Sequence, residues 1–285
     1  MDTIEEEDPL QLNLWEGIVL AIVQGLTEFL PVSSSGHLVI VQSLFKGFEQ
    51  PGVLFDVVLH FGTLLAVLFF LRREVVAIMK SLVPCAWGET ETHEFGSVRA
   101  TRNLAVSIVI ATIVTGVIGI TFEDAVHDLF TSVRTVTVAL VITGILLFFS
   151  DKVKKGGRDE GQITFCDGAV IGLVQGLALI PGISRSGSTI AVGIFRGLKG
   201  ETAARFSFLI SMPAVLGATI LELRYAAMVP VTTMIIYGVS MVVACITGFL
   251  TLRLLLFVIS KRKLRAFAYY CWTLALVTFV VSCIK

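Results

Sequence analysis

Six long apolar runs constrain the fold of this chain more than any other feature of its sequence. The runs are Val53–Leu71, Leu104–Ile120, Val133–Phe149, Ala203–Leu221, Val229–Ile259 and Ala266–Ile284. Each approaches or exceeds the ~18 residues that mark a transmembrane helix. Only 15% of the residues are charged, whereas soluble domains carry about a quarter. The sequence therefore predicts an all-α, multi-pass integral membrane protein.

The charged residues sum to a formal net charge of zero, which gives no electrostatic reason to expect a nucleic-acid partner. The first residues, MDTIEEEDPL, are acidic. They lack the basic start of a signal peptide, so residues 1–10 are interpreted as a solvated acidic tail.

Two segments of the chain resemble each other at a fixed offset of 151 residues. The first is GIVLAIVQGLTEFLPVSSSGHLVIV, from Gly17, and the second is GAVIGLVQGLALIPGISRSGSTIAV, from Gly168. Chance similarity between apolar, Gly-rich stretches would rarely preserve a Gln-Gly-Leu triplet, a proline and an SxSG cluster together. A duplication is therefore predicted, in which one membrane domain over residues 1–285 is built of repeats at about 12–150 and 163–285.

Each repeated motif is predicted to form two half-length helices with Pro, Gly and Ser between them. The expected helices are residues 14–30 and 36–44 in the first copy, and 167–180 and 187–198 in the second. Half-length helices that meet at an irregular turn are typical of a re-entrant hairpin, whose backbone must be buried in protein or line a polar cavity. Each repeat then contributes three full crossings, and an odd number inverts the second copy. The predicted fold has six transmembrane helices, two re-entrant helical hairpins and an inverted repeat.

The distribution of lysine and arginine sets the expected orientation. With this topology, sixteen basic side chains fall on one side of the membrane and four on the other. Basic loops are retained in the cytoplasm, so both termini are predicted to lie outside. Treating residues 11–44 as one full crossing would instead scatter the basic residues over both faces.

Three ionisable residues lie in the breaks of the two hairpins: Glu28, His37 and Arg185. An ionisable side chain at membrane depth costs about 3 kcal/mol, so such residues are functional candidates. Inverted hairpins can bring both breaks together near the midplane, where the three side chains would converge. The alternative is a Glu28–Arg185 ion pair that only pins the hairpins together, but the surrounding hydroxyls exceed what a pin requires.

The two Ser-rich turns are predicted to form one anion site. The expected binding residues are Ser33, Ser34 and Ser35 in the first turn, and Ser184, Ser186 and Thr189 in the second. Each turn leads into a helix whose first N–H groups can bind an anion, and Arg185 adds a fork-shaped cation that suits phosphate oxygens. One such turn alone would indicate ordinary helix capping. Two matched turns and a buried arginine favour an oxyanion ligand.

Gln24 and Glu28 are four residues apart and share one helix face. A carboxylate beside phosphate oxygens can hold Mg²⁺ or Ca²⁺, or act as a base to water. Glu28 alone provides too few ligands, so phosphate oxygens and waters would complete the shell. His37 suits a nucleophile on phosphorus or a general acid, and the sequence does not separate these roles. Asp56 and His60, also four apart, either form a local hydrogen-bonded pair, the favoured account, or border the cavity.

At these residues the chain resembles the undecaprenyl-diphosphatase family of bacitracin-resistance proteins. The family signature (E/Q)xxxE matches Gln24 to Glu28, and a PVSSSGH-like stretch follows from Pro31 to His37. The second signature, PGxSRSxxT, matches from Pro181 to Thr189. The similarity extends over nearly the whole chain. The chain departs from many members at Gln24, where they carry a second carboxylate.

The resemblance implies hydrolysis of undecaprenyl diphosphate to the monophosphate, which recycles the lipid carrier for peptidoglycan and other cell-wall glycans. It also implies catalytic roles for Glu28, His37, Arg185 and Ser34, a divalent cation, a place in the plasma membrane and bacitracin resistance. A homodimer is compatible with the sequence, which sets no oligomeric state. An inverted-repeat transporter or lipid-phosphate flippase is the alternative, because hairpins meeting at the midplane suit both functions. A structural scaffold would have no use for a buried carboxylate and guanidinium.

Overall fold

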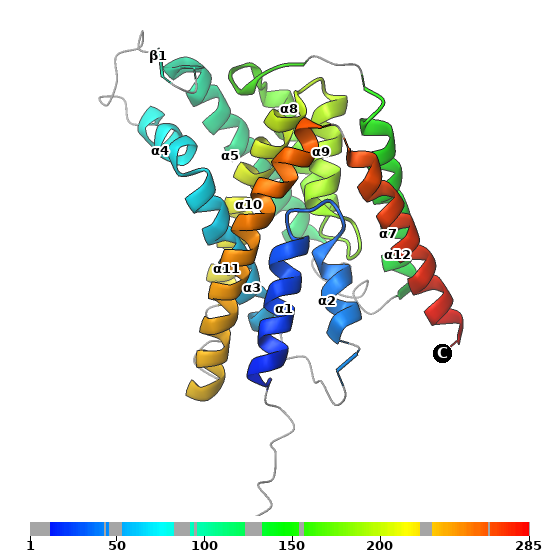
Figure 1. Ribbon diagram of the computed structural model, residues 1–285. Coiled ribbons are helices and arrows are strands. Elements are labelled where there is room, and N and C mark those ends of the chain that lie inside the picture. The colour runs from blue at the N-terminus through cyan, green and yellow to red at the C-terminus, as the bar shows by residue number, and fades with distance from the viewer. Residues whose placement is uncertain are drawn as a thin grey trace, which may run out of the picture.

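The computed structural model describes residues 12–42, 44–45, 53–82, 92–93, 96–122, 133–153, 157–222, 230–261 and 263–284. Over these residues the protein is almost entirely helical (Figure 1). Its other regular elements there are a short 3₁₀ helix, η1 (Glu160–Gln162), and a two-residue antiparallel pair, β1 (Thr92–His93) and β2 (Gly96–Ser97). The predicted acidic tail, residues 1–10, lies outside the described residues.

Each repeated motif forms two short helices that pack together as a helical hairpin. The first comprises α1 (Leu14–Thr27) and α2 (Ser34–Gln42), and the second comprises α8 (Phe165–Leu177) and α9 (Arg185–Phe195). Capping boxes at Asn13 and Thr164 start α1 and α8 by satisfying free N–H groups of the first turn. The breaks between the helices contain the prolines and residues with positive φ. In Figure 1, α1 and α2 run side by side in the lower half of the molecule, and α8 and α9 occupy the upper half.

The six apolar runs all form helices. These are α3 (Val53–Phe70), α5 (Val98–Thr121), α7 (Val133–Ser150), α10 (Gly200–Glu222), α11 (Val231–Ser260) and α12 (Leu264–Ile284). Among the described helices, α5, α10 and α11 are each long and apolar enough to cross a membrane. A fourth candidate span is α3 together with α4 (Arg72–Ser81), which the sequence did not predict as a separate helix and which bends away by 79°. The chain is a multi-pass, all-helical membrane protein.

Each hairpin packs on a long helix from the other half of the chain. The first helix of the first hairpin, α1, lies against α11, and its counterpart α8 lies against α5. Glycines make both approaches possible: a Cβ at Gly17 would lie 2.7 Å from the Ser240 hydroxyl, and one at Gly172 would lie 2.6 Å from the Cα of Ala111. Such distances are too short for any side chain. The two halves are therefore interlocked, which fixes the hairpins relative to each other.

A buried carboxylate binds two arginines at the open end of the second hairpin. Asp167, which is fully buried, accepts two hydrogen bonds from the Arg158 guanidinium (2.6 and 3.0 Å) and one from Arg196 Nε (2.9 Å). Its Oδ2 also accepts hydrogen bonds from the backbone and hydroxyl of Thr164. Asp167 lies in the first turn of α8 and Arg196 directly follows α9, so these bonds hold the open ends of the hairpin together.

Candidate active site

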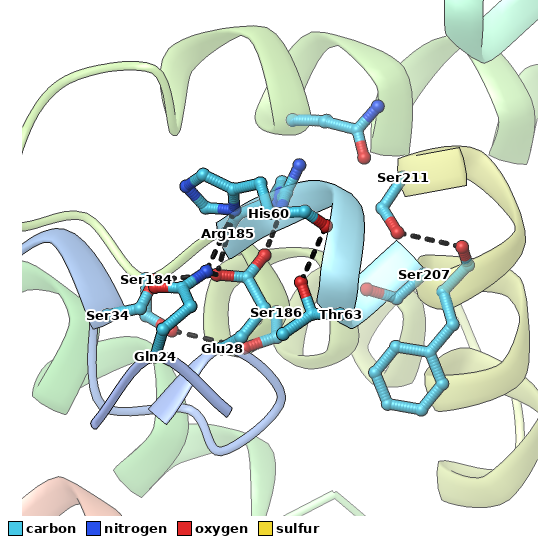
Figure 2. Close-up of polar contacts among 12 residues, drawn as sticks. Gln24, Glu28, Ser34, His60, Thr63, Ser184, Arg185, Ser186, Ser207 and Ser211 are labelled. Carbon is cyan, nitrogen blue, oxygen red and sulfur yellow. Dashed lines mark hydrogen bonds and ion pairs between the residues drawn. The ribbon is translucent and has the colours of Figure 1, made fainter. Parts of the chain in front are cut away.

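Glu28 and Arg185 meet at the centre of the molecule, although 157 residues separate them in the chain. Glu28 follows the last turn of α1, and Arg185 is the first residue of α9. The Glu28 side chain is 6% exposed and the Arg185 side chain 25% exposed, and Nη2 of the arginine donates to Oε1 of the carboxylate. Figure 2 shows the pair with its polar neighbours. The predicted convergence of the two hairpin breaks is confirmed for these two side chains.

Ser34 completes this pair from the first hairpin. Its hydroxyl donates to Glu28 Oε2 at 2.7 Å. Ser34 and Arg185 occupy equivalent positions in the two repeats, since their numbers differ by the repeat offset of 151. Each is the first residue of the second helix in its hairpin. The repeat therefore delivers two different donors to one carboxylate, a hydroxyl from one copy and a guanidinium from the other.

His60 lies in the site, although the sequence favoured a local hydrogen-bonded pair with Asp56. It lies in the middle of α3, and its Nδ1 is 3.4 Å from Glu28 Oε2 and 3.0 Å from Gln24 Nε2. Gln24 Nε2 also donates to Glu28 Oε2 at 3.0 Å. Nδ1 of His60 therefore lies between a donor, the Gln24 amide, and an acceptor, the Glu28 carboxylate, and the tautomer of the ring decides which of the two it bonds. A histidine in the middle of an apolar run was the available signal, and its contacts with Gln24 and Glu28 make His60 part of the site. That His60 borders a cavity stays a prediction.

The His37 side chain makes its hydrogen bonds to Ser33 and Tyr270. Its Nδ1 lies 2.7 Å from the carbonyl oxygen of Ser33, and its Nε2 lies 2.7 Å from the hydroxyl of Tyr270, whose ring stacks on the imidazole. A carbonyl only accepts, so Nδ1 carries the proton and Nε2 presents a lone pair to the tyrosine. Among the described residues, these are the polar contacts of His37. The contact predicted among the three ionisable groups is shown for Glu28 and Arg185, and for His37 it stays a prediction.

The paired serines of the two turns adopt matching arrangements. The hydroxyls of Ser33 and Ser35 are 3.3 Å apart, and those of Ser184 and Ser186 are also 3.3 Å apart. In the second turn, Ser184 caps α9 by accepting a hydrogen bond from the Gly187 N–H at 3.1 Å. Ser186 reaches across to the first hairpin and donates to the Leu30 carbonyl at 3.2 Å. The two turns are thus in direct contact, and the N-termini of α2 and α9 both begin beside Glu28.

Thr189 lies one turn into α9 and is fully buried. Its hydroxyl bonds the Arg185 carbonyl at 2.7 Å and the Ser207 hydroxyl at 2.6 Å. These contacts tie the first turn of α9 to α10, so in this conformation Thr189 supports the backbone of Arg185 rather than facing an open space.

Only the first half of the chain carries the acid and the imidazole. Gln175 repeats Gln24 and is equally buried, but the positions equivalent to Glu28 and His60 are Leu179 and Ser211. Gln175 instead donates to the Thr115 hydroxyl and the Ile210 carbonyl, both at 3.2 Å. The two copies therefore form one site between them: the first supplies the carboxylate and the imidazole, and the second supplies the arginine and structural support.

The protein oxygens of this site could hold a divalent cation only if phosphate oxygens of a bound substrate completed the coordination shell of the cation. Among the described residues, no three His, Cys, Asp or Glu side chains cluster closely enough to form a protein cage. The Oε1 of Gln24, however, is buried without a hydrogen-bond partner among the described residues, one helical turn from Glu28. Mg²⁺ is commonly bound by one or two protein oxygens together with substrate phosphates. Glu28 and Gln24 are the residues that could hold such an ion, with a neutral amide in place of a second carboxylate.

Comparison with known proteins places this site in a family. The chain is 42% identical over 276 residues to an undecaprenyl-diphosphatase of Syntrophotalea carbinolica, which covers 95% of this chain and 100% of that protein. It is 41% identical over 278 residues to an undecaprenyl-diphosphatase of Desulforapulum autotrophicum, with 95% and 99% covered. The corresponding protein of Methanosphaera stadtmanae is 37% identical over 276 residues, again with 95% and 99% covered.

These matches extend across both hairpins and all the long helices, so the whole architecture is shared and not one motif alone. The family model of the bacitracin resistance protein BacA covers residues 17–277, a range that includes the paired carboxylate and guanidinium and every residue that contacts them. The chain therefore belongs to the family of the bacitracin resistance protein BacA.

Proposed function

We propose that the chain hydrolyses undecaprenyl diphosphate, or a closely related polyprenyl diphosphate, to the monophosphate and inorganic phosphate, and so recycles the lipid carrier of cell-wall glycan synthesis. The observation that carries the proposal is the contact of both Arg185 and Ser34 with Glu28 beside two helix N-termini. A guanidinium and helix N-termini are groups that bind phosphate. Relatives of similar length carry the name of this activity. A polyprenyl tail stays in the bilayer because each buried CH₂ contributes about 0.8 kcal/mol, so the headgroup has to reach a site at membrane depth.

The topology proposed for this function has six membrane crossings, two re-entrant hairpins and inverted repeats at about 12–150 and 163–285. The exchange of packing partners, α1 on α11 and α8 on α5, supports it. Both termini are outside, because the basic side chains gather at the opposite end. The first hairpin then enters from the outer face, and its break brings Glu28 to the depth of Arg185.

Arg185 is proposed to bind the diphosphate. One of its terminal nitrogens is held by Glu28, which leaves the other donors of the planar guanidinium for phosphate oxygens. Serines of the two turns and the first N–H groups of α2 and α9 add further donors. Glu28 already accepts hydrogen bonds from Ser34 and Gln24 as well as from Arg185. It is therefore better placed to orient these donors, and to hold a cation, than to remove a proton from water.

A divalent cation, Mg²⁺ or Ca²⁺, is proposed to be held by Glu28 and the Oε1 of Gln24. When bound, it would supply positive charge to the phosphate oxygens. Such a charge is needed because Glu28 balances Arg185 in the resting site, whereas a diphosphate is strongly anionic. The unpartnered Gln24 oxygen supports this assignment.

The two histidines are proposed to have complementary roles. His37 presents a lone pair on Nε2, which suits attack on the terminal phosphorus or removal of a proton from the attacking water, once the Tyr270 hydroxyl moves aside. With its proton on Nε2, the His60 ring would donate a hydrogen bond, without giving up the proton, to the phosphate that leaves when the P–O–P bond breaks. His37 therefore uses a lone pair, and His60 donates a hydrogen bond.

A matched pair of substitutions tests these roles. Asn at position 37 or 60 retains a group near the position of Nδ1 and removes Nε2 in both cases. We expect His37→Asn to lower kcat by about 10²- to 10⁴-fold, the usual contribution of a proton-transfer group. His60→Asn should lower kcat by about 10- to 100-fold, since a hydrogen-bond donor is lost but the attacking group remains. Phosphate release at saturating substrate measures both effects, and a larger loss in His60→Asn than in His37→Asn would reverse the assignment.

The function itself is tested with purified full-length protein in detergent and a synthetic polyprenyl diphosphate. We expect release of one phosphate per lipid, loss of release on addition of EDTA, and recovery when Mg²⁺ or Ca²⁺ is restored. Release that is unaffected by EDTA would remove the cation from the mechanism. An absence of release from the wild-type protein with either metal present would refute the proposed function.

A further inference from the structure

A cavity lined by both charged and apolar side chains lies between α3, α4, α10 and α11, and none of the residues that contact Glu28 or Arg185 lines it. It has a volume of 730 Å³ and occupies the bend between α3 and α4, with α10 and α11 on its other sides. Figure 1 shows α4 turning away from α3 at this point. Four arginines line it, Arg72, Arg73, Arg205 and Arg253, against a single carboxylate, Glu74. The lining is therefore strongly positive.

The carboxylate of the cavity, Glu74, pairs with one of its arginines, Arg205. The Nε of Arg205 also lies 3.6 Å from Glu160. Arg253 is exposed, and its guanidinium lies 4.8 Å from the centre of the Phe249 ring. Arg72, at the first position of α4, is also exposed. The cavity thus places at least two accessible guanidinium groups around one space.

The rest of the cavity wall is apolar and faces outward from the helix bundle. Phe69 is 60% exposed, Ile246 57% and Leu250 59%. The rings of Phe70 and Phe249 pack edge to face with their centres 5.9 Å apart. In a membrane-spanning helix, exposed side chains of this kind contact lipid chains. One part of the cavity is therefore lined by arginines, and the adjoining part opens to the hydrocarbon of the membrane.

We propose that this cavity binds the headgroup of an anionic phospholipid from the leaflet at the basic end of the protein, with its acyl chains against Phe69, Ile246 and Leu250. Charge complementarity selects the headgroup, because basic pockets between membrane helices at this end of a protein suit anionic lipids. The bidentate geometry of arginine suits its phosphate. The lipid braces the 79° bend between α3 and α4. Through α3, it supports the helix that carries His60 at the other site.

The test uses the full-length protein in nanodiscs of phosphatidylcholine with increasing fractions of phosphatidylglycerol. We expect a saturable rise in the thermal unfolding temperature, since a ligand that binds only the folded state stabilises it. Native mass spectrometry should show one phosphatidylglycerol retained per chain. Inorganic phosphate at the same concentration should neither reproduce the rise nor displace the lipid, which separates a lipid headgroup from a free phosphate.

The variant Arg72→Gln/Arg253→Gln should bind phosphatidylglycerol about thirtyfold more weakly, given the usual contribution of a basic residue to anionic lipid binding. Arg99→Gln is the matched control, because Arg99 is an exposed arginine at the start of α5 and does not line the cavity. It should bind as the wild type does. Equal retention by the double variant and the control would overturn the proposal, as would stabilisation of the wild type by phosphatidylcholine alone. If the double variant does not fold, the phosphatidylglycerol titration of the wild type and the single variant Arg253→Gln decide the question.

Discussion

Arg185→Lys is expected to lower kcat for phosphate release by about 10³-fold, the loss typical of removing an arginine that stabilises charge in phosphoryl transfer. Lysine retains the positive charge but presents a point ammonium in place of the planar fork. It cannot contact Glu28 and span two phosphate oxygens in the same geometry. Initial rates with a polyprenyl diphosphate measure the effect.

Arg185→Ala should lower kcat further, and comparison of the two variants separates the contribution of charge from that of geometry. Arg134→Lys is the control, because Arg134 is an exposed residue of α7 without a place in the site. Its rate should equal that of the wild type. Wild-type kcat in Arg185→Lys would show that the guanidinium fork is not needed and would remove the bidentate clamp from the mechanism.

The second large effect is expected for Glu28→Gln, which retains the shape of the side chain and removes its charge. We expect kcat to fall by about 10²- to 10³-fold, because Arg185 and Ser34 lose the carboxylate that orients them and the cation loses its anionic ligand. The folded protein should also lose on the order of 1–3 kcal/mol of stability, since Arg185 is left without its partner. Phosphate release and thermal unfolding measure the two effects separately.

A further readout distinguishes the metal role of Glu28 from a purely structural one. If Glu28 holds the cation, the concentration of Mg²⁺ needed for half-maximal residual activity should rise in Glu28→Gln. Glu160→Gln is the matched control, since Glu160 also lies near an arginine, 3.6 Å from Arg205 Nε, but in the 3₁₀ helix at the basic end. It should keep wild-type activity and metal dependence. An unchanged Mg²⁺ requirement in Glu28→Gln would assign Glu28 to positioning alone.

Much of the active site could be predicted because its residues are ionisable or polar, whereas the segments around them are apolar. Glu28 and Arg185 are ionisable residues within apolar hairpins: Glu28 shortly precedes Pro31, and Arg185 shortly follows Pro181. The repeat then indicated that the two breaks are equivalent and could meet. His60 and Tyr270 could not be assigned in this way. Each lies within a regular helix, where local sequence does not determine which neighbour its ring will contact.

The sequence alone determined the helical membrane architecture, the two broken hairpins and the anionic character of the ligand, because hydrophobicity, Pro and Gly positions and buried charge act locally along the chain. Only the tertiary structure decided which groups meet. It placed His60 beside the Glu28 carboxylate, His37 beside Tyr270, and a cationic cavity at the bend of α3 and α4. These outcomes depend on how helices from the two halves pack together, and side-chain contacts across such interfaces are set by close packing rather than by periodicity.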